Sequence, residues 1–434
     1  MDDAVPDASV QHFADLDLRL VKAVRGIRVL ATVAWPAAVE RQFLADLKRG
    51  HETLPRFDYV APDFSPQRAE LAMIAATADA SHPLGAWLAR SAASWGIAAR
   101  MLEAVGTAGT TAPSIELYGK PNDPLPGGGQ TNLDAARWFL AIAEELGDAQ
   151  ALTEAEYCIP AEVLRAEVQA AVDARFGMGR VRVAIDPELT AKAAAGATRI
   201  RLRGATCFSE YDRSQLLAHE AFVHTLTARN GRAQPVLKSL ARTAPRATAT
   251  QEGLAVFAEL MSGSIDLARL QRISLRIPAI DMALKGADFI EVYRWFRGHG
   301  QSITDSFHST QRVYRGVPVT GGAAFTKDNV YLAGLLTVHT FFRWAFKRRR
   351  LDLMQHLFAG KLALDDAIAL GPCFADGTVA PPRFLPAWVE RSQGLAAKLA
   401  FADFVRSSMI ATPIDFDAMV ATPTRQPPER PSMA

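Results

Sequence analysis

Cysteine is scarce in this sequence, with only three among 434 residues. Cys158, Cys207 and Cys373 lie far apart, are odd in number and form no C-x-x-C pair. The sequence therefore predicts neither a disulfide framework nor a metal site built from cysteines. This cysteine usage suits a reducing cytoplasm.

Export and membrane signals are also missing. The first residues, MDDAVPDASV, are acidic and lack the charged-then-apolar layout of a signal peptide. The most apolar long stretch, residues 330–346, carries His339 and Arg343 and is too short to span a bilayer. We expect a buried core helix there, no membrane partner and a cytoplasmic location.

Neither sign of charge is in large excess, because the formal net charge is only +2. That balance argues against a general nucleic-acid-binding protein, which usually carries a strong basic excess. Two catalytic signatures are absent as well. The glycine run at 127–129 lacks the Gly-Lys-Ser/Thr of a phosphate loop, and there is no G-x-S-x-G elbow of a serine hydrolase.

What the sequence does contain is mainly helical patterning. Hydrophobic residues make up 49% of the chain, and helical periodicity predicts helices at about residues 10–26, 36–49, 67–77, 84–104 and 132–146. Segments 181–185 (VRVAI) and 199–202 (RIRL) alternate apolar and polar residues, as half-buried strands do. We therefore predict an α+β fold, predominantly helical, with a small sheet beside the helix that carries the motif described below.

A Pro- and Gly-rich segment at 120–130, KPNDPLPGGGQ, has the composition of a linker. We expect an N-terminal helical region over residues 1–130, packed on a catalytic region over residues 131–421. Residues 422–434 are rich in Pro, Arg, Gln and Ser and have the composition of a disordered tail.

The most informative segment, LLAHEAFVHTLTARNG, contains His219-Glu220-x-x-x-His224. Zinc favours imidazole nitrogen and carboxylate oxygen, and a catalytic zinc site has three protein ligands and an open position for water. A glutamate beside the first histidine suits a hydrolase, because it takes a proton from the zinc-bound water and passes it to the leaving group. The motif predicts one Zn²⁺ ion on His219 and His224, with Glu220 as the general base.

The five-residue spacing of the two histidines imposes a condition on the helix. At ~100° per residue the two side chains would point ~140° apart on a regular α-helix, too far to share one ion. A π-bulge would restore their alignment, and such bulges occur mostly at functional sites. We therefore predict a locally widened helix turn between His219 and His224.

A third ligand is expected from a glutamate on the next helix, as in His₂Glu peptidase sites. Glu252 lies 28 residues after His224 at the start of an amphipathic segment. Glu259 is the rival, or an acceptor for a histidine N–H from outside the metal's ligand set. Glu252 also fits the acidic first turn of a helix, and that structural role is compatible with metal binding.

Four segments resemble one known family. They are QEGLA (251–255), HEAFVHTLTARNGRAQP (219–235), VGTAGTTAPSIELYGKP (105–121) and YRGVPVTGGAAFTKDNVYLAGLL (314–336). Their order and content are similar to the microtubule-associated tyrosine carboxypeptidase family. The sequence most resembles its bacterial branch, named for flavohaemoglobin-expression modulation and for the QEGLA motif.

The resemblance implies a zinc-carboxypeptidase-like fold with the metal on His219, His224 and Glu252. Eukaryotic relatives remove a C-terminal aromatic residue from tubulin, a substrate that does not carry over to a bacterial-type chain. Phe222 stands where eukaryotic members have a glycine, and a ring beside the metal would narrow the cleft.

A carboxypeptidase must recognise a free terminal carboxylate. Arg315 and Lys327 are the candidates, because a guanidinium fork or an ammonium binds carboxylate oxygens. Tyr331, one helical turn after Lys327, is the candidate donor to the oxyanion. The strand at 199–202 is a candidate edge for pairing with substrate backbone.

The sequence thus predicts a zinc metallopeptidase that trims the C-terminus of a peptide or protein. Two alternatives stay open. One is a non-catalytic regulatory protein that keeps zinc for structure, and the other is an amidase or aminopeptidase acting on a small amide. A structural zinc site needs four protein ligands and no base, so Glu220 discriminates between the first alternative and an enzyme.

Overall fold

The computed structural model describes residues 8–147, 158–189, 191–204 and 206–408. The chain divides into two compact units, Met1–Glu390 and Arg391–Ala434. The described part of the second unit is one helix, α20 (Ser392–Ser408). The predicted tail at 422–434 lies outside the described residues, and the boundary near residue 130 stays a prediction.

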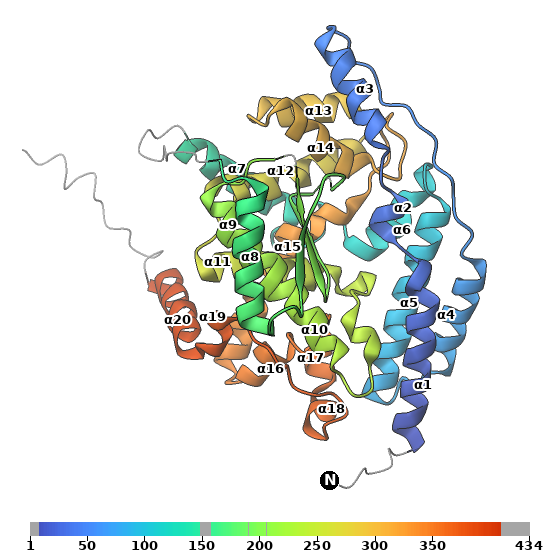
Figure 1. Cartoon of the computed structure of the whole chain (residues 1–434), viewed down its shortest axis with the longest axis vertical. Coiled ribbons are helices and arrows are strands. Elements are labelled where there is room, and N and C mark those ends of the chain that lie inside the picture. The colour runs from blue at the N-terminus through green and yellow to red at the C-terminus, as the bar shows by residue number, and fades with distance from the viewer. Residues whose placement is uncertain (1–7, 148–157, 190, 205, 409–434) are drawn as a thin grey trace, which may run out of the picture. The chain divides into compact units, whose positions relative to one another are not determined.

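The first unit begins with helices close to the predicted ranges: α1 (Ala8–Ala23), η1 (Val24–Gly26), α2 (Val29–Thr32), α3 (Ala37–Lys48), α4 (Ser65–Thr77), α5 (Pro83–Glu103), η2 (Ala108–Thr110), α6 (Thr111–Tyr118) and α7 (Asn132–Gly147). Helices α1, α4 and α5 run side by side (Figure 1). Helix α5 starts at a proline, whose fixed φ suits a first turn, and the His82 side chain caps it by accepting from the Leu84 N–H.

A three-stranded sheet follows α8 (Ala161–Phe176), in the order β1-β3-β2. β1 (Arg182–Asp186) pairs parallel with β3 (Arg199–Arg203), and β2 (Ala193–Ala195) pairs antiparallel with β3. Helix α8 lies along the sheet (Figure 1). The predominantly helical α+β class is confirmed. The predicted use of strand 199–202 as a free edge is wrong, because β3 is the central strand and both its edges are paired.

The sheet leads into α9 (Glu210–Leu216), the π-helix η4 (Leu217–Thr225) and α10 (Leu226–Arg232), one continuous helical run. Ser209 and Asp212 form a capping box that satisfies the first N–H groups of α9. Strands β2 and β3 pack on η4, and Thr225 Oγ1 donates to the Gly196 carbonyl at 3.1 Å. The small sheet therefore lies beside the motif helix, as predicted.

The expectation of no disulfide is wrong, because Cys158 and Cys207 are bonded to each other. They are 49 residues apart in sequence, yet their Cα atoms are 5.0 Å apart. The reason is the antiparallel bridge between Ile159 and Phe208, the residues that directly follow the two cysteines, which brings the cysteines within bonding reach. The cysteine-based argument for a reducing compartment therefore fails, and Cys373 is a free, buried thiol.

The rest of the unit is helical, and α11 packs extensively on α15. Residues 330–346 form the predicted core helix, with Leu332, Val338 and Phe342 fully buried. Among the residues that the structure describes, none of the helices combines the length and apolar character that crossing a bilayer requires. The elements are η5 (Lys238–Ala241), η6 (Pro245–Ala247), α11 (Thr248–Ser262), α12 (Leu267–Leu284), α13 (Phe289–Gly298), α14 (Ile303–Tyr314), η7 (Thr326–Asn329), α15 (Val330–Lys347), α16 (Leu351–His356), α17 (Leu364–Ala369), α18 (Gly371–Ala375) and α19 (Ala387–Glu390).

Candidate metal centre

Three side chains from two helices converge on one point. His219 and His224 extend from η4, and Glu252 extends from the first turns of α11. One ligand atom from each lies within 4.8 Å of the others. Each imidazole Nε2 is 3.6 Å from Glu252 Oε2. Two imidazole nitrogens and a carboxylate oxygen are the donor set of a catalytic zinc site, so these residues fit a single Zn²⁺ ion.

The widened helix turn is confirmed. Residues 217–225 form a π-helix, inserted between the α-helical turns of α9 and α10. Its wider turn brings the two imidazole centroids to 4.7 Å, with the rings nearly perpendicular at 84°. The π-helix therefore explains how two histidines that are five residues apart can point to the same place.

The Nδ1 side of His219 is held by a carboxylate. Nδ1 lies 2.7 Å from Glu259 Oε1, and Arg269 donates to both oxygens of Glu259 at 3.0 and 3.1 Å. Glu259 is fully buried, and burial raises its pKa, but the Arg269 charge and the His219 contact together lower that pKa to about 2. An ionised Glu259 fixes the imidazole with its Nε2 toward Glu252, as a carboxylate does behind a metal-binding histidine.

Glu252 is flanked by a lysine. Lys327 Nζ lies 3.1 Å from Oε1, whereas Oε2 faces the two imidazoles. Burial opposes ionisation of Glu252, but the Lys327 charge and the histidine contacts hold its pKa well below the usual value. Burial likewise lowers the pKa of His224. These directions favour a charged Glu252 and a neutral His224, the forms that coordinate a metal. His219 differs, because burial lowers its pKa but its hydrogen bonds with Glu252 and Glu259 outweigh burial and raise that pKa to about 10 in the absence of a metal charge.

Glu220 is half-buried and has no hydrogen-bond or ion-pair partner among the described residues. Its charge acts on both His219 and Lys361, so the carboxylate lies within electrostatic reach of the converging ligands. Lys361 lies in the loop between α16 and α17, and burial lowers its pKa to about 8. Sequence reasoning missed Lys361, because no motif surrounds it.

A family model described as microtubule-associated tyrosine carboxypeptidase matches residues 41–407. The chain belongs to this family. Membership implies a peptidase of the carboxypeptidase type. No curated protein sequence matches the chain.

The separated segments that resemble the family meet in the fold. Ser114 Oγ accepts from the Thr326 N–H at 2.8 Å, and Thr111 Oγ1 accepts from the Ala324 N–H at 3.2 Å. Asn329 donates to the Tyr118 carbonyl at 3.2 Å. Helix α6 therefore supports the short η7 helix that carries Lys327.

Arg315 and Tyr331 lie in a buried cluster around Asp328. Arg312 binds both oxygens of Asp328, whereas Arg276 and Arg315 approach the same carboxylate only at 3.5 and 3.8 Å. The Tyr331 ring lies 5.1 Å from the Arg276 guanidinium. Burial, reinforced by the Arg312 charge, lowers the pKa of Arg276 and of Arg315 to about 10. Three guanidiniums around one carboxylate leave a surplus of positive charge.

This arginine cluster (Arg276, Arg312 and Arg315) adjoins the converging ligands through Lys327, the residue before Asp328. The Lys327 ammonium lies 5.3 Å from the centroid of the Tyr331 ring. Of the two sequence-predicted binding residues, Lys327 contacts a converging ligand directly, whereas Arg315 contacts Asp328, the residue after Lys327. Arg276 and Arg312 were missed, because single arginines on helices carry no motif.

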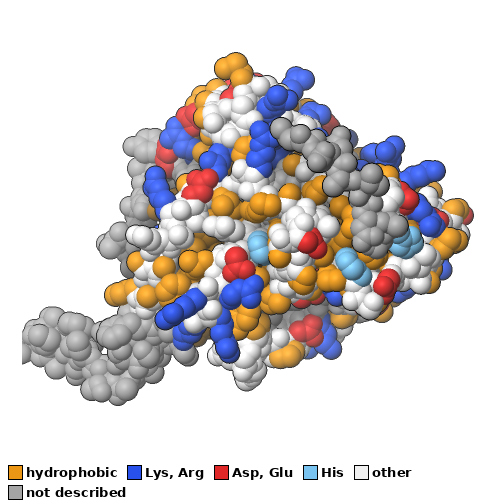
Figure 2. Space-filling view, turned by 90° about the horizontal axis from the view of Figure 1, so that it is seen from below, with side chains coloured by type: hydrophobic (Ala, Val, Ile, Leu, Met, Phe, Trp, Pro, Cys, Tyr) orange, Lys and Arg blue, Asp and Glu red, His pale blue; other side chains and the backbone are white. Residues whose placement is uncertain are grey.

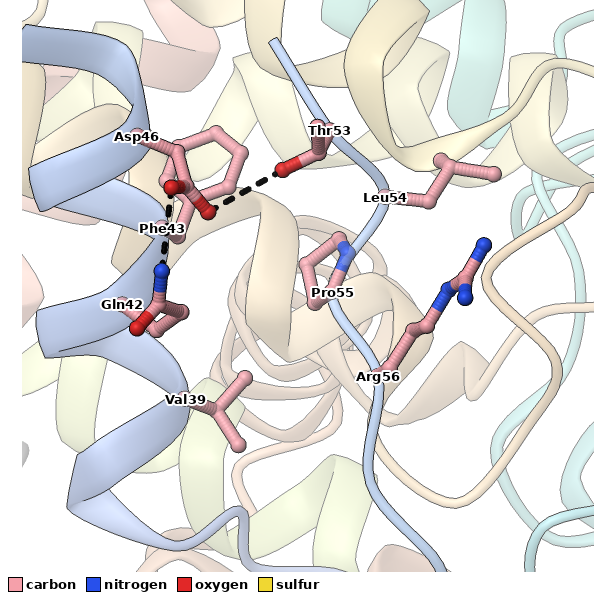
Figure 3. Close-up of a pocket in the computed structure, with 8 residues that line it drawn as sticks. All are labelled: Val39, Gln42, Phe43, Asp46, Thr53, Leu54, Pro55 and Arg56. Carbon is pink, nitrogen blue, oxygen red and sulfur yellow. Dashed lines mark hydrogen bonds between the residues drawn. The ribbon is translucent and has the colours of Figure 1, made fainter. Parts of the chain in front are cut away.

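A separate groove of about 520 Å³ lies between α3 and the segment after it (Figure 3). It is lined by Val39, Gln42, Phe43, Asp46, Thr53, Leu54, Pro55 and Arg56. Asp46 is already bonded to Gln42 and Thr53, so its carboxylate serves the local structure. The groove shares no residue with the converging ligands. On the face in Figure 2, acidic and basic side chains are mixed and form no field of one sign.

Proposed function

We propose that the protein is a zinc-dependent carboxypeptidase that removes residues from the C-terminus of a peptide or protein. The observation that carries the proposal is the convergence of His219, His224 and Glu252 within 4.8 Å on a π-helix and its neighbour. Glu259 supports it, because a buried carboxylate behind His219 is the usual partner of a metal-binding imidazole.

When bound, the metal supplies a Lewis acid that polarises the scissile carbonyl and makes water more acidic. Glu220 is the proposed general base. Its carboxylate takes a proton from the attacking water and delivers it to the departing amine. This role requires a carboxylate that is not already held by a hydrogen bond or an ion pair with another side chain. The absence of a direct partner for Glu220 among the described residues supports that role.

The surplus charge of the arginine cluster supports a carboxylate subsite. Arg315 Nε is buried without a hydrogen-bond partner among the described residues, and Arg276 makes only one long contact with Asp328. A terminal carboxylate would satisfy both donors. Lys327, beside Glu252, is proposed to face the same end of the substrate, and Tyr331 to donate to the oxyanion.

The alternatives are less well supported. A purely structural zinc site needs a fourth protein ligand, and no further His, Cys, Asp or Glu joins the three within the described ranges. An amidase for small amides would not need several guanidiniums beside the metal ligands. Neither the preferred terminal residue nor tubulin follows from these contacts.

The decisive variant is Glu220→Gln, which removes the base and leaves the ligands in place. It should bind one zinc per chain and lose hydrolysis of peptides with free C-termini, measured by mass spectrometry of released amino acids. His224→Ala should lose the zinc, whereas the exposed Glu188→Gln should behave as wild type. A metal-free wild type, an active Glu220→Gln, or equal cleavage of C-terminally amidated peptides would contradict the proposal.

A further inference from the structure

Lys361 is a buried lysine without a direct partner. Lys361 is only 6% exposed to solvent. Its ammonium makes no hydrogen bond or ion pair with any residue in the described part of the chain. Lys327, the other lysine at the centre, differs because its Nζ is 3.1 Å from Glu252. Burying an unpaired charge costs several kcal/mol. A charged lysine at this position therefore calls for an anionic partner when the protein is at work.

The backbone around Lys361 is fixed against the metal-ligand helix. The Lys361 N–H donates to the Leu240 carbonyl at 2.8 Å. The next residue, Leu362, accepts from Gln251 Nε2 at 3.2 Å, and Gln251 directly precedes Glu252. The ammonium is therefore presented from a segment that is hydrogen-bonded to the first turn of α11.

A second hydrogen bond and a close backbone contact also hold the segment around Lys361 in place. The Leu364 N–H donates to Thr250 Oγ1 at 3.1 Å. On the other side, Gly360 lies so close to Leu240 that an added Cβ would be 2.8 Å from the Leu240 Cβ. The segment is thus held at both ends, and the position of Lys361 is set by the fold.

The charges that act on Lys361 show what it faces. They are the carboxylates of Glu252 and Glu220, and the Lys361 charge in turn acts on His224. These three groups surround the point where the ligands converge. The Lys361 ammonium therefore belongs to the surroundings of the converging ligands, where the proposed function puts the scissile carbonyl.

We propose that Lys361 is a catalytic residue that binds the carbonyl oxygen of the scissile bond as it becomes negative. Water adds to the carbonyl carbon, Glu220 takes the water's proton, and the carbonyl π electrons become the charge on the oxygen that Lys361 faces. The oxygen then re-forms the carbonyl, the C–N bond breaks, and the amine leaves with the proton from Glu220. This role rests on the proposed function and complements Tyr331. Preorganised positive groups at such an oxygen act mainly on the transition state.

The test compares Lys361→Met and Lys361→Arg with wild type in the zinc-loaded full-length protein. Lys361→Met should lower kcat about 100- to 1000-fold, as loss of an oxyanion donor does, with KM changed by less than about 3-fold. Lys361→Arg should recover part of the loss, because it keeps the charge. Zinc content should stay at one ion per chain. The exposed Lys22→Met is the matched control and should equal wild type.

Binding measurements separate catalysis from substrate anchoring. In a Glu220→Gln background, calorimetry with an uncleaved substrate peptide should give the same Kd with and without Lys361→Met. A phosphinic peptide, which mimics the tetrahedral state, should bind Lys361→Met more weakly in proportion to the fall in kcat/KM.

Unchanged kcat, loss of zinc, or equally weakened binding of substrate and phosphinic peptide would each overturn the role of Lys361. The proposed function fails differently, through a metal-free wild type or an active Glu220→Gln. An inactive, zinc-bound Glu220→Gln together with a fully active Lys361→Met would reject only this inference.

Discussion

The Nδ1 atom of His219 lies 2.7 Å from Oε1 of Glu259, seven residues after Glu252 on the same helix. One helix therefore supplies both a ligand to the proposed metal and the carboxylate that orients another ligand. The spacing of two helical turns makes this possible, because residues seven apart lie on one face of a helix.

Glu259→Gln should weaken zinc binding about 10- to 100-fold, because the amide loses the charge that fixes and polarises His219. Competitive titration with a zinc chelator would measure this. The exposed Glu116→Gln on α6 serves as the control and should keep wild-type affinity. Unchanged affinity in Glu259→Gln would mean that the contact serves packing alone.

Gly253→Ala should destabilise the protein by about 3 kcal/mol, because it overpacks a helix contact. A Cβ on Gly253 would lie 2.2 Å from the Gly334 backbone of α15. Separating α11 from α15 would also move Glu252 away from Lys327, so zinc affinity should fall. Urea unfolding and zinc titration check both effects.

Gly96→Ala supplies the contrast. Gly96 lies inside α5, and an added Cβ there meets nothing within 4 Å. Alanine should stabilise this helix by up to about 1 kcal/mol, because glycine loses more backbone entropy on folding. A Gly253→Ala variant that matched Gly96→Ala in stability would show that the α11–α15 contact tolerates the methyl group.

Removing the Cys158–Cys207 bond should lower the free energy of unfolding by about 2–4 kcal/mol, because the bond closes a long loop in the unfolded chain. The double variant Cys158→Ser/Cys207→Ser tests this by urea unfolding. Reductant should destabilise wild type, whose bonded cysteines are both solvent-exposed, and leave the double variant unaffected. Cys373→Ala, which removes the free thiol, should keep the response to reductant.

Asp17 should make stability depend on pH. It is fully buried, and Ser239 donates to it through both its N–H and its hydroxyl. Burial raises the pKa of Asp17 from 3.8 to about 6, despite those bonds. The folded state therefore binds more protons than the unfolded state between these values. Stability should fall as pH rises through this window, by about 3 kcal/mol in all.

Asp17→Asn isolates that dependence, because its amide does not titrate. The difference in unfolding free energy between wild type and Asp17→Asn should change across the window and be flat above pH ~7. Asp15→Asn, at an exposed position on the same helix, should follow the wild-type profile. A constant difference from pH 4 to 7 would rule out the raised pKa.

Local patterning in the sequence predicts most of the helices and pairs His219 with His224, whereas the family resemblance favours Glu252 over Glu259. Apolar periodicity located α1, α3, α4, α5, α7 and the core helix α15 to within a few residues. The five-residue interval between His219 and His224 required a wider turn, because ~100° per residue cannot align them. These features are local, so neighbouring residues carry the information.

The remaining features depend on how distant segments pack against one another. Cys158 meets Cys207 across 49 residues because Ile159 pairs with Phe208, and β3 is central because strands from both sides pair with it. Arg276 and Lys361 approach the centre from separate segments that no shared motif connects. Such contacts depend on how distant helices pack. The residues next to a buried charge in the sequence do not indicate which distant side chain it will face.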